Sequence, residues 1–258
     1  MRGLRLTLRH YYDFGTDRVV VGDDLMSPES WDGLRTRTSG VFSIPATREE
    51  FVRAAEERAD LEARARAIDA WLEDQGAGAI ASYGVGGAAL EWWLHRLRPD
   101  RGLIVTDYGQ ATVERLGELF PEADARYHDL RGDGPVQADV HLFHRVDTEL
   151  TDNEWPEVFA RFAQARILLV AADVLDVRRL LFELRHRPLM KRRHATSAGF
   201  IRTRAALESL WRPTHADQAV RMRDLNAWAL EPRRAQPSPA AAAAADATTP
   251  ASSSDSSG

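Results

Sequence analysis

A glycine-rich turn, with an aspartate 23 residues after its first glycine, is the part of this sequence best suited to hold a ligand. The turn, Gly84-Val85-Gly86-Gly87-Ala88-Ala89, fits the pattern G-x-G-x-x-A, and Asp107 ends the next apolar strand pattern. Glycines let a chain turn tightly and bring its backbone close to a ligand. An acid at the tip of a strand can accept hydrogen bonds from both hydroxyls of a ribose. The pattern therefore favours a nucleotide-like ligand over a purely structural turn.

His144 is the best candidate for a general base elsewhere in the chain. It stands at the carboxyl end of a strand expected at residues 140–144, and the ordinary pKa of histidine suits proton transfer near neutral pH. A histidine that hydrogen-bonds the neighbouring loop is an equally good interpretation. Asp147 could orient His144 or hold an amine, or it could be a residue at the entry of a helix.

Several other kinds of chemistry are disfavoured. His141 and His144 are three residues apart on an expected strand, so their side chains point to opposite faces, and no metal site is expected. We assign no role to His141. No G-x-S-x-G elbow of a serine hydrolase occurs. Cysteine is absent, which excludes disulfides and a cysteine nucleophile, and Lys191 is the only lysine among 34 basic residues.

The segments around the glycine turn predict the fold that positions it. An apolar strand is expected at residues 79–82, a helix from about Leu90 and a second strand at 103–106. Strand, glycine turn, helix, strand and acid together are typical of the nucleotide-binding half of a doubly wound α/β domain. The same pattern suits a dinucleotide, so it does not distinguish NAD from another adenosine-bearing cofactor.

Helices and strands continue to alternate after Asp107, as a mostly parallel sheet requires. The expected helices end near residues 120, 163, 187 and 211, and the expected strands are 123–127, 140–144, 167–172, 198–201 and 218–222. Residues 188–194 read as a basic loop. The last two strands, around a short helix, suggest a hairpin at the edge of the sheet.

The two ends of the chain differ from this middle part. Residues 1–45 are irregular and read as a cover, with a short strand at 18–21 and a helix start near Ser27. Aromatic residues in such a segment more often anchor it than line a lid. A capping box at 47–50 predicts one long helix to about Asp74. We expect a cover (1–45), a domain (46–232) and a disordered, low-complexity tail (233–258).

The composition is ordinary for a soluble globular protein: 258 residues, 44% apolar and 28% charged. A net charge of -5 argues against general nucleic-acid binding, which usually needs a basic surface. No apolar core of signal-peptide length follows the basic N-terminus, and no apolar window is long enough to span a bilayer. We therefore expect a cytoplasmic protein without a nucleic-acid or membrane partner.

Residues 46–232 resemble the class I S-adenosylmethionine-dependent methyltransferase family. In that family the first strand ends in acid-x-Gly-x-Gly-x-Gly, and Ser82-Tyr83-Gly84-Val85-Gly86-Gly87-Ala88 matches two of the glycines. Ser82 stands in the place of the acid, which in the family often lies near the amino-acid end of the cofactor. The resemblance implies that Ser82, Tyr83, Gly84 and Gly86 contact S-adenosylmethionine. It also implies a seven-stranded sheet with an antiparallel edge strand.

The other positions of the family pattern are present. Asp107 resembles the acid that holds the ribose hydroxyls, with Tyr108 packing on the adenine, and Asp129-Leu130 resembles the segment that meets the adenine amino group. The segment from 139 to 147, which contains His144 and Asp147, resembles the one that reaches the reactive methyl. These features imply methyl transfer to a small molecule.

Two alternatives to this function stay open. One is an NAD(P)-dependent oxidoreductase, which the glycine turn also suits. It is disfavoured by the late hairpin and by the length of chain before the turn. The other is a non-catalytic nucleotide-binding protein on the same fold, which Ser82 makes credible because the usual acid is missing.

Overall fold

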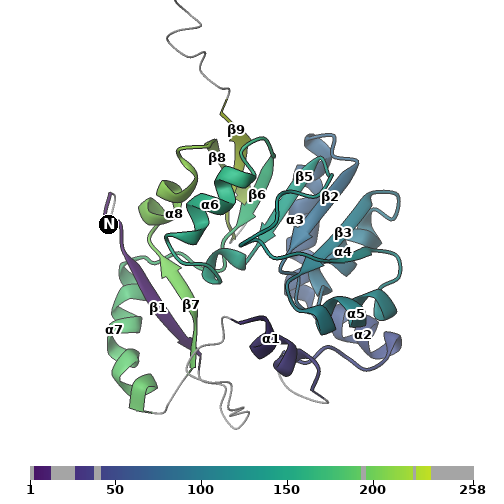
Figure 1. The fold of residues 1–258 in the computed structure, drawn as a ribbon, viewed down its shortest axis with the longest axis horizontal. Helices are drawn as coiled ribbons and strands as arrows, with labels where there is room; N and C mark the ends of the chain where they lie inside the picture. Colours follow the sequence, from purple (N-terminus) through teal and green to yellow (C-terminus); the bar gives the residue numbers. More distant parts are fainter. Residues whose placement is uncertain (1–2, 13–26, 38–41, 193–195, 223–224, 234–258) are drawn as a thin grey trace, which may run out of the picture.

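The computed structural model describes residues 3–12, 27–37, 42–192, 196–222 and 225–233. Its centre is a seven-stranded sheet in the order β4-β3-β2-β5-β6-β9-β8 (Figure 1). The first five strands in that order are parallel, β9 runs antiparallel to β6, and β8 runs antiparallel to β9. The expected doubly wound, mostly parallel seven-stranded sheet is confirmed, and its antiparallel strand, β9, lies one position in from the edge, between β6 and β8. Its strands are β2 (Ala79–Tyr83), β3 (Gly102–Asp107), β4 (Asp124–Tyr127), β5 (Val140–His144), β6 (Ile167–Val170), β8 (His215–Met222) and β9 (Leu225–Pro232).

Helices cover both faces of this sheet because alternate residues of its buried strands face opposite ways. Ile80, Leu142 and Leu168 pack under one set of helices, whereas Tyr83 and Phe143 pack under the other. The first set is α2 (Arg48–Glu56), α3 (Ala59–Asp74), α4 (Ala89–Leu97) and α5 (Gln110–Leu119), and the second is α6 (Glu154–Arg161) and α8 (Arg204–Trp211).

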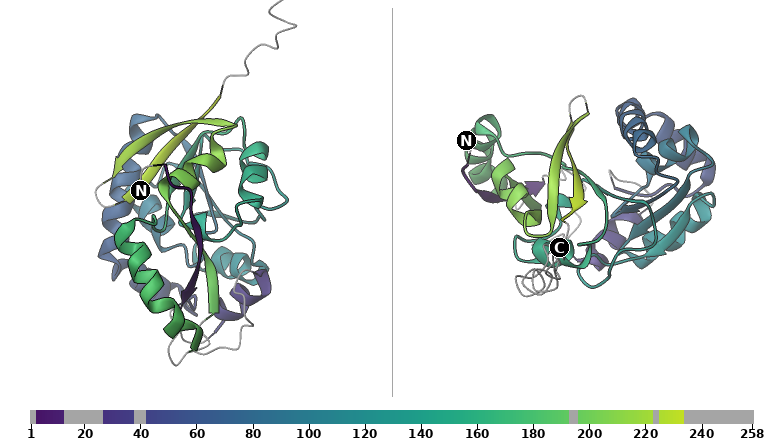
Figure 2. Two further views of the ribbon diagram at one scale, coloured as in Figure 1. Left: turned by 90° about the vertical axis from the view of Figure 1, so that its left-hand side faces the viewer. Right: turned by 90° about the horizontal axis from the view of Figure 1, so that it is seen from above.

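A small two-stranded sheet lies apart from the large one. It pairs β1 (Thr7–Tyr12) antiparallel with β7 (Thr196–Arg202), and with α7 (Val177–Arg192) it lies on the side of the molecule away from α2 to α4 (Figures 1 and 2). The expectation that the strand near 198–201 belongs to the edge hairpin was therefore wrong. The hairpin consists of β8 and β9 instead. Most of β8 is exposed at the sheet edge, so its sequence carries little apolar alternation.

Two expected helix boundaries also differ from the structure. The helix start at Thr47 is confirmed, because the Thr47 hydroxyl accepts from the Glu50 amide (3.2 Å), and the Glu50 carboxylate reaches back to the amide of Ala46, the residue before the cap (3.2 Å). The long helix after it divides into α2 and α3 near Arg58, where the backbone leaves helical geometry although no glycine or proline marks the break. The expected basic loop is instead the end of α7, which continues through Pro188.

Part of the N-terminal cover is a short helix, α1 (Pro28–Arg35), that begins where the sequence predicts. Ser27 caps it, accepting from the Ser30 amide at 3.2 Å. The strand expected at 18–21 and the tail from 234 onward lie outside the described residues. No helix in the described part of the chain is long and apolar enough to cross a membrane.

Substitution of Gly199 is expected to destabilise the fold. Gly199 has φ +122° and lies against the backbone carbonyl of Thr148, which an added Cβ would overlap. Strain and overlap together should lower the free energy of unfolding of Gly199→Ala by roughly 2–4 kcal/mol. Gly117→Ala, in α5 with open space around its Cβ position, is the control and should gain about 0.5–1 kcal/mol. Chemical denaturation measures both, and equal effects would contradict the assignment of strain to Gly199.

Candidate functional site

A cavity of about 390 Å³ lies at the carboxyl ends of β2, β3 and β5. The strand order reverses here, since β2 has β3 on one side and β5 on the other, and ligands of open α/β sheets bind at such switch points. The volume is within the range of small-molecule sites. The cavity is lined by the glycine turn, by α1 and by residues that follow β3 and β5.

The glycine turn has the conformation that its sequence predicts. Gly84 and Gly86 have φ of +64° and +57°, which side chains other than glycine rarely adopt. A Cβ on Gly84 would lie 2.6 Å from Cγ1 of Val146, and one on Gly86 would lie 3.4 Å from Nη2 of Arg35. Gly84 is therefore needed for the turn to pass close to Val146, and both glycines favour the positive φ of the turn.

Asp107 lies where the sequence places it, at the end of β3, but its carboxylate is already engaged. Oδ1 accepts from Nη1 of Arg35 at 2.6 Å and from the Gly109 amide at 3.0 Å, and Oδ2 accepts from the Gly86 amide at 3.1 Å. The Asp107 side chain is fully buried and that of Arg35 is 9% exposed. A ribose can therefore reach this carboxylate only when Arg35 withdraws.

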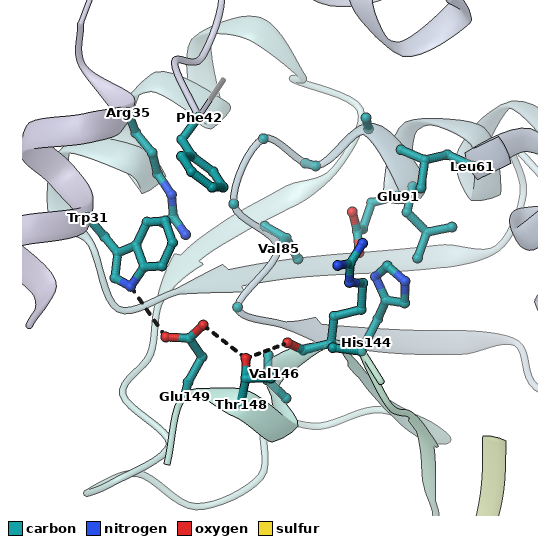
Figure 3. Close-up of a pocket in the computed structure, with 18 of the residues that line it drawn as sticks. Trp31, Arg35, Phe42, Leu61, Val85, Glu91, His144, Val146, Thr148 and Glu149 are labelled. Atoms are coloured by element: carbon teal, nitrogen blue, oxygen red, sulfur yellow. Dashed lines mark hydrogen bonds between the residues drawn. The ribbon is translucent and has the colours of Figure 1, made fainter. Parts of the chain in front are cut away.

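An aromatic wall from the N-terminal cover forms one end of the cavity (Figure 3). Trp31 and Phe42 pack edge to face with centroids 5.3 Å apart, and the Arg35 guanidinium lies 5.1 Å from the Trp31 ring centroid. The Trp31 indole donates to Oε2 of Glu149 at 3.3 Å, and burial raises the pKa of Glu149 to about 7. The expectation that the cover's aromatic residues mainly anchor it is therefore incomplete, since two of them line the cavity.

Asp32 fixes this wall to the domain. Its carboxylate accepts hydrogen bonds from the backbone amides of Ala111 and Thr112 (both 3.2 Å) and from the Thr112 hydroxyl (2.9 Å), at the start of α5. A carboxylate is favourable at a helix N-terminus, so this contact holds α1 in place over the end of β3.

Tyr108 lines the cavity next to Asp107, as the resemblance implies. The guanidinium of Arg131 lies 5.5 Å from its ring centroid. Its hydroxyl is buried without a hydrogen-bond partner in the described part of the chain, and burial raises its pKa above the ordinary range. Asp129 and Leu130 are not among the described lining residues, and the Asp129 carboxylate accepts from the Arg131 amide at 2.9 Å.

Ser82 and Tyr83, both expected at the cofactor, are the last two residues of β2, before the turn, and neither is among the described residues that line the cavity. The Tyr83 ring packs on the opposite face of the sheet, and its hydroxyl is 3.0 Å from Nδ1 of His141. Ser82 is fully buried and donates to Oε1 of Glu91 at 2.7 Å. Of the residues in these contacts, Glu91, in the first turn of α4, is the one that lines the cavity. The sequence signal for it is its place on the helix that follows the turn.

His144 lines the cavity but is a weak base in this arrangement. Its Nε2 lies 3.0 Å from Nη1 of Arg64, and because a guanidinium only donates, Nε2 must be the acceptor. Burial, with Arg64 and Arg145 nearby, lowers the pKa of His144 to about 3. The structure does not pair it with Asp147, whose Oδ1 accepts from the Ala172 amide at 2.7 Å.

Asp147 lies outside the cavity as far as the described residues show. Burial raises its pKa to about 6, and its backbone carbonyl accepts from Nη1 of the buried Arg202. Its bonds join the turn after β5 to the segment after β6. The described residues contain no group of three metal-ligating side chains.

No protein-family model and no curated protein matches this sequence. Solved structures match its fold. Human N-acetylserotonin methyltransferase (ASMT), solved in complex with SAM, is 17% identical with a TM-score of 0.53, over 73% of this chain and 57% of that one. "PigF with SAH" is 12% identical with a TM-score of 0.56, over 79% and 62%. The mitomycin 7-O-methyltransferase MmcR is 19% identical with a TM-score of 0.54, over 73% and 57%.

At these identities the likeness establishes the fold, which is that of the class I S-adenosylmethionine-dependent methyltransferases. The resemblance drawn from the glycine turn and Asp107 is confirmed at that level. The chain spans less than two thirds of the length of these three structures.

Replacing Glu91 by glutamine should remove a pH-dependent loss of stability. Burial raises the pKa of Glu91 from 4.5 to about 7, so the unfolded chain releases this proton at lower pH than the folded chain. Stability therefore falls as pH rises from 4.5 to 7 and stays reduced above 7. Relative to wild type, Glu91→Gln should gain about 2 kcal/mol more at pH 8 than at pH 5. Denaturant unfolding at both pH values measures this, and a constant difference would contradict it.

Proposed function

We propose that this protein is an S-adenosylmethionine-dependent methyltransferase that acts on a small molecule. The observation that carries the proposal is the cavity against the glycine turn, at the switch point of a sheet with the methyltransferase strand order and antiparallel β9. We assign the activity to residues 46–232 and treat residues 1–45 as their cover. A cytoplasmic location and the absence of nucleic-acid partners remain part of this proposal.

Several residues at or next to the cavity are of the kinds that the proposed cofactor needs, although Asp107 lies behind Arg35 and is not among the described lining residues. The backbone of Gly84 and Gly86 would lie against it, Asp107 would accept from its ribose, and Tyr108 and Trp31 would flank its adenine. The cofactor supplies a methyl group activated by a sulfonium. Asp107 can take this role only after Arg35 leaves Oδ1, so we propose that binding displaces the Arg35 side chain. Asp129 and Leu130 would contact the adenine only after a rearrangement of their loop.

The protein's part in such a reaction is chiefly to position the acceptor. Methyl transfer is an in-line displacement, and holding the two reactants in line supplies much of the rate. An acceptor that must lose a proton needs a base as well. We propose His144 for this role, with the Arg64 hydrogen bond broken first because it occupies Nε2. For Asp147 we propose positioning of the turn that carries His144.

An oxidoreductase is the weaker alternative, since the antiparallel β9 between β6 and β8 is part of the methyltransferase strand order. A binding protein without catalysis is supported by one observation, the hydrogen bond from Arg64 that occupies Nε2 of His144. Titration calorimetry with S-adenosylmethionine, S-adenosylhomocysteine and NAD distinguishes an oxidoreductase from a methyltransferase. Binding of NAD and of neither sulfur ligand would overturn the proposed function.

Asp107→Ala should weaken S-adenosylhomocysteine binding by roughly ten- to a hundredfold, because hydrogen bonds to a charged group contribute about 1.5–3 kcal/mol each. Asp139→Ala is a matched control. Its carboxylate also accepts from two backbone amides, of Gly78 and Ala79 (both 2.8 Å), but these lie at the amino ends of β2 and β5, away from the cavity. It should leave the affinity unchanged. Equal losses in the two variants would show that Asp107 acts on stability alone.

His144→Ala should lower the turnover of a methyl acceptor while donor affinity stays within about twofold. The physical reason is that the imidazole lies at the carboxyl end of β5 and would contact the acceptor rather than the nucleoside. Screening acceptors with labelled donor, followed by steady-state kinetics and calorimetry, measures the two effects separately. A parallel loss of turnover and donor affinity would point to a structural histidine.

A further inference from the structure

Exposed apolar side chains gather on α7, away from the cavity. Val177, Leu181 and Leu184 are 55%, 62% and 56% exposed, and Phe182 is 45% exposed. These are four of the six large apolar side chains that are exposed in the described part of the chain. Single apolar residues on a surface are ordinary, but a group of them on one element marks a contact surface. None of the described residues that line the cavity belongs to α7, so this feature is separate from the proposed function.

Three of these residues form a stripe along the outward side of the helix. Val177, Leu181 and Leu184 follow the spacing i, i+4, i+7, which places them on one face. The helix turns a polar group inward instead, since Oε1 of the buried Glu183 lies 3.1 Å from Nδ1 of His10 in β1. A surface helix ordinarily buries its apolar stripe. In α7, which lies at the outer side of the small sheet, the arrangement is reversed (Figures 1 and 2).

Two arginines border the stripe on one flank. Arg178 and Arg185 are exposed, lie seven residues apart, and each follows a residue of the stripe. Neither forms an ion pair in the part of the chain that the structure describes. Where two helices pack along such a stripe, the residues beside it face the partner, and their charges decide which partner binds. Glu183 is the only acid between residues 177 and 192, and it faces the small sheet, so the described outer face of α7 is positive.

We propose that the outer face of α7 binds an acidic amphipathic helix of another protein. The apolar side of that helix packs on the stripe, and its carboxylates pair with Arg178 and Arg185. A second copy of α7 fits poorly, because it brings the same two arginines and no acid to neutralise them. A lipid surface fits poorly as well, because a stripe of two turns suits the anchor spacing of helix recognition better than a helix that lies in a bilayer interface.

The test uses synthetic peptides of the proposed chemistry as probes. Three labelled peptides of about four heptads carry the same leucine seam, with the flanking positions all Glu, all Gln or all Lys. Fluorescence anisotropy with the full chain measures their dissociation constants. The Glu peptide should bind about threefold or more tightly than the Gln peptide, because two exposed ion pairs contribute modestly, and the Lys peptide should bind most weakly. Salt at about 0.5 M should remove most of this order, because it screens exposed charges.

Variants of α7 locate the binding. Leu181→Ser, at the centre of the stripe, should weaken all three peptides by about fivefold or more, because it removes the most exposed apolar side chain of the contact. Arg178→Glu combined with Arg185→Glu should reverse the order, so that the Lys peptide binds most tightly and the Glu peptide most weakly.

Matched substitutions elsewhere on the surface serve as controls. Tyr127→Ser removes another exposed apolar side chain, at the end of β4 and 51% exposed. Arg53→Glu combined with Arg221→Glu reverses two other exposed arginines, in α2 and β8. Both controls should leave the three dissociation constants within about twofold. All of these variants alter exposed positions and should unfold at nearly the same denaturant concentration as the wild type, which separates lost contact from lost fold.

Several results would overturn the proposal. One is equal binding of the three peptides, or binding of none. Another is a change in the control variants as large as the change in the α7 variants. If Leu181→Ser instead abolishes binding to vesicles of phosphatidylserine and phosphatidylcholine, or dissociates a dimer seen in sedimentation, the surface belongs to a lipid or to a second copy of the chain, and an acidic helix is not its occupant.

Discussion

A carboxylate buried at the end of β3 has to be neutralised, and the group that does so comes from a helix outside the doubly wound domain. Asp107 accepts from Arg35, from the turn at Gly86 and from the loop at Gly109, so one side chain joins α1, the glycine turn and the start of α5. Breaking a buried pair by removing one partner typically costs about 3–5 kcal/mol. The position of Arg35 between Asp107 and the cavity depends on this ion pair, and any ligand that needs Asp107 has to offer comparable hydrogen bonds.

The position of the cavity follows from the sheet. Alternation along β2 sends Tyr83 to the α6 face and Ser82 to the α4 face, where it meets Glu91. The strands on either side of β2 end in Asp107 and His144, so these residues lie at the same, carboxyl-terminal end of the parallel strands. Asp107, Ser82 and His144 are far apart in the sequence, and the pairing of the parallel strands β3, β2 and β5 is what brings them to the same region.

The sequence was sufficient for the parts of the structure that follow local rules. The glycine turn, Asp107 at the strand tip and the helix start at Thr47 are dictated by positive φ, strand ends and helix capping, and all three are confirmed. Two contacts between distant segments could not be predicted. Nothing in the residues near 198 shows that β7 pairs with β1, and nothing in α1 shows that Arg35 reaches Asp107.

The charged site residues show the same limit. The sequence pattern predicts Ser82 at the cofactor; in the structure its side chain is buried and donates to Glu91, which lines the cavity. His144 lines the cavity, and Arg64, which is 80 residues away in the sequence, occupies its Nε2 and so changes what the imidazole can do. A pKa depends on such neighbours, which only the tertiary structure supplies.

The small sheet has a consequence for the order in which the chain can be completed. Leu4 and Leu6 bond to Thr203, across separations of 199 and 197 residues, and β1 has its partner only once β7 exists. During synthesis the first residues must wait for nearly the whole domain, and closing so long a loop costs entropy before any contact forms. The pairing of β1 is therefore among the last contacts of the domain that can form, whereas the contacts of α1 with Asp107 and with the start of α5 do not depend on β7. Once β1 has paired, α1 therefore lies in the sequence between two anchored elements, β1 and α2, in addition to its own contacts with the end of β3 and the start of α5.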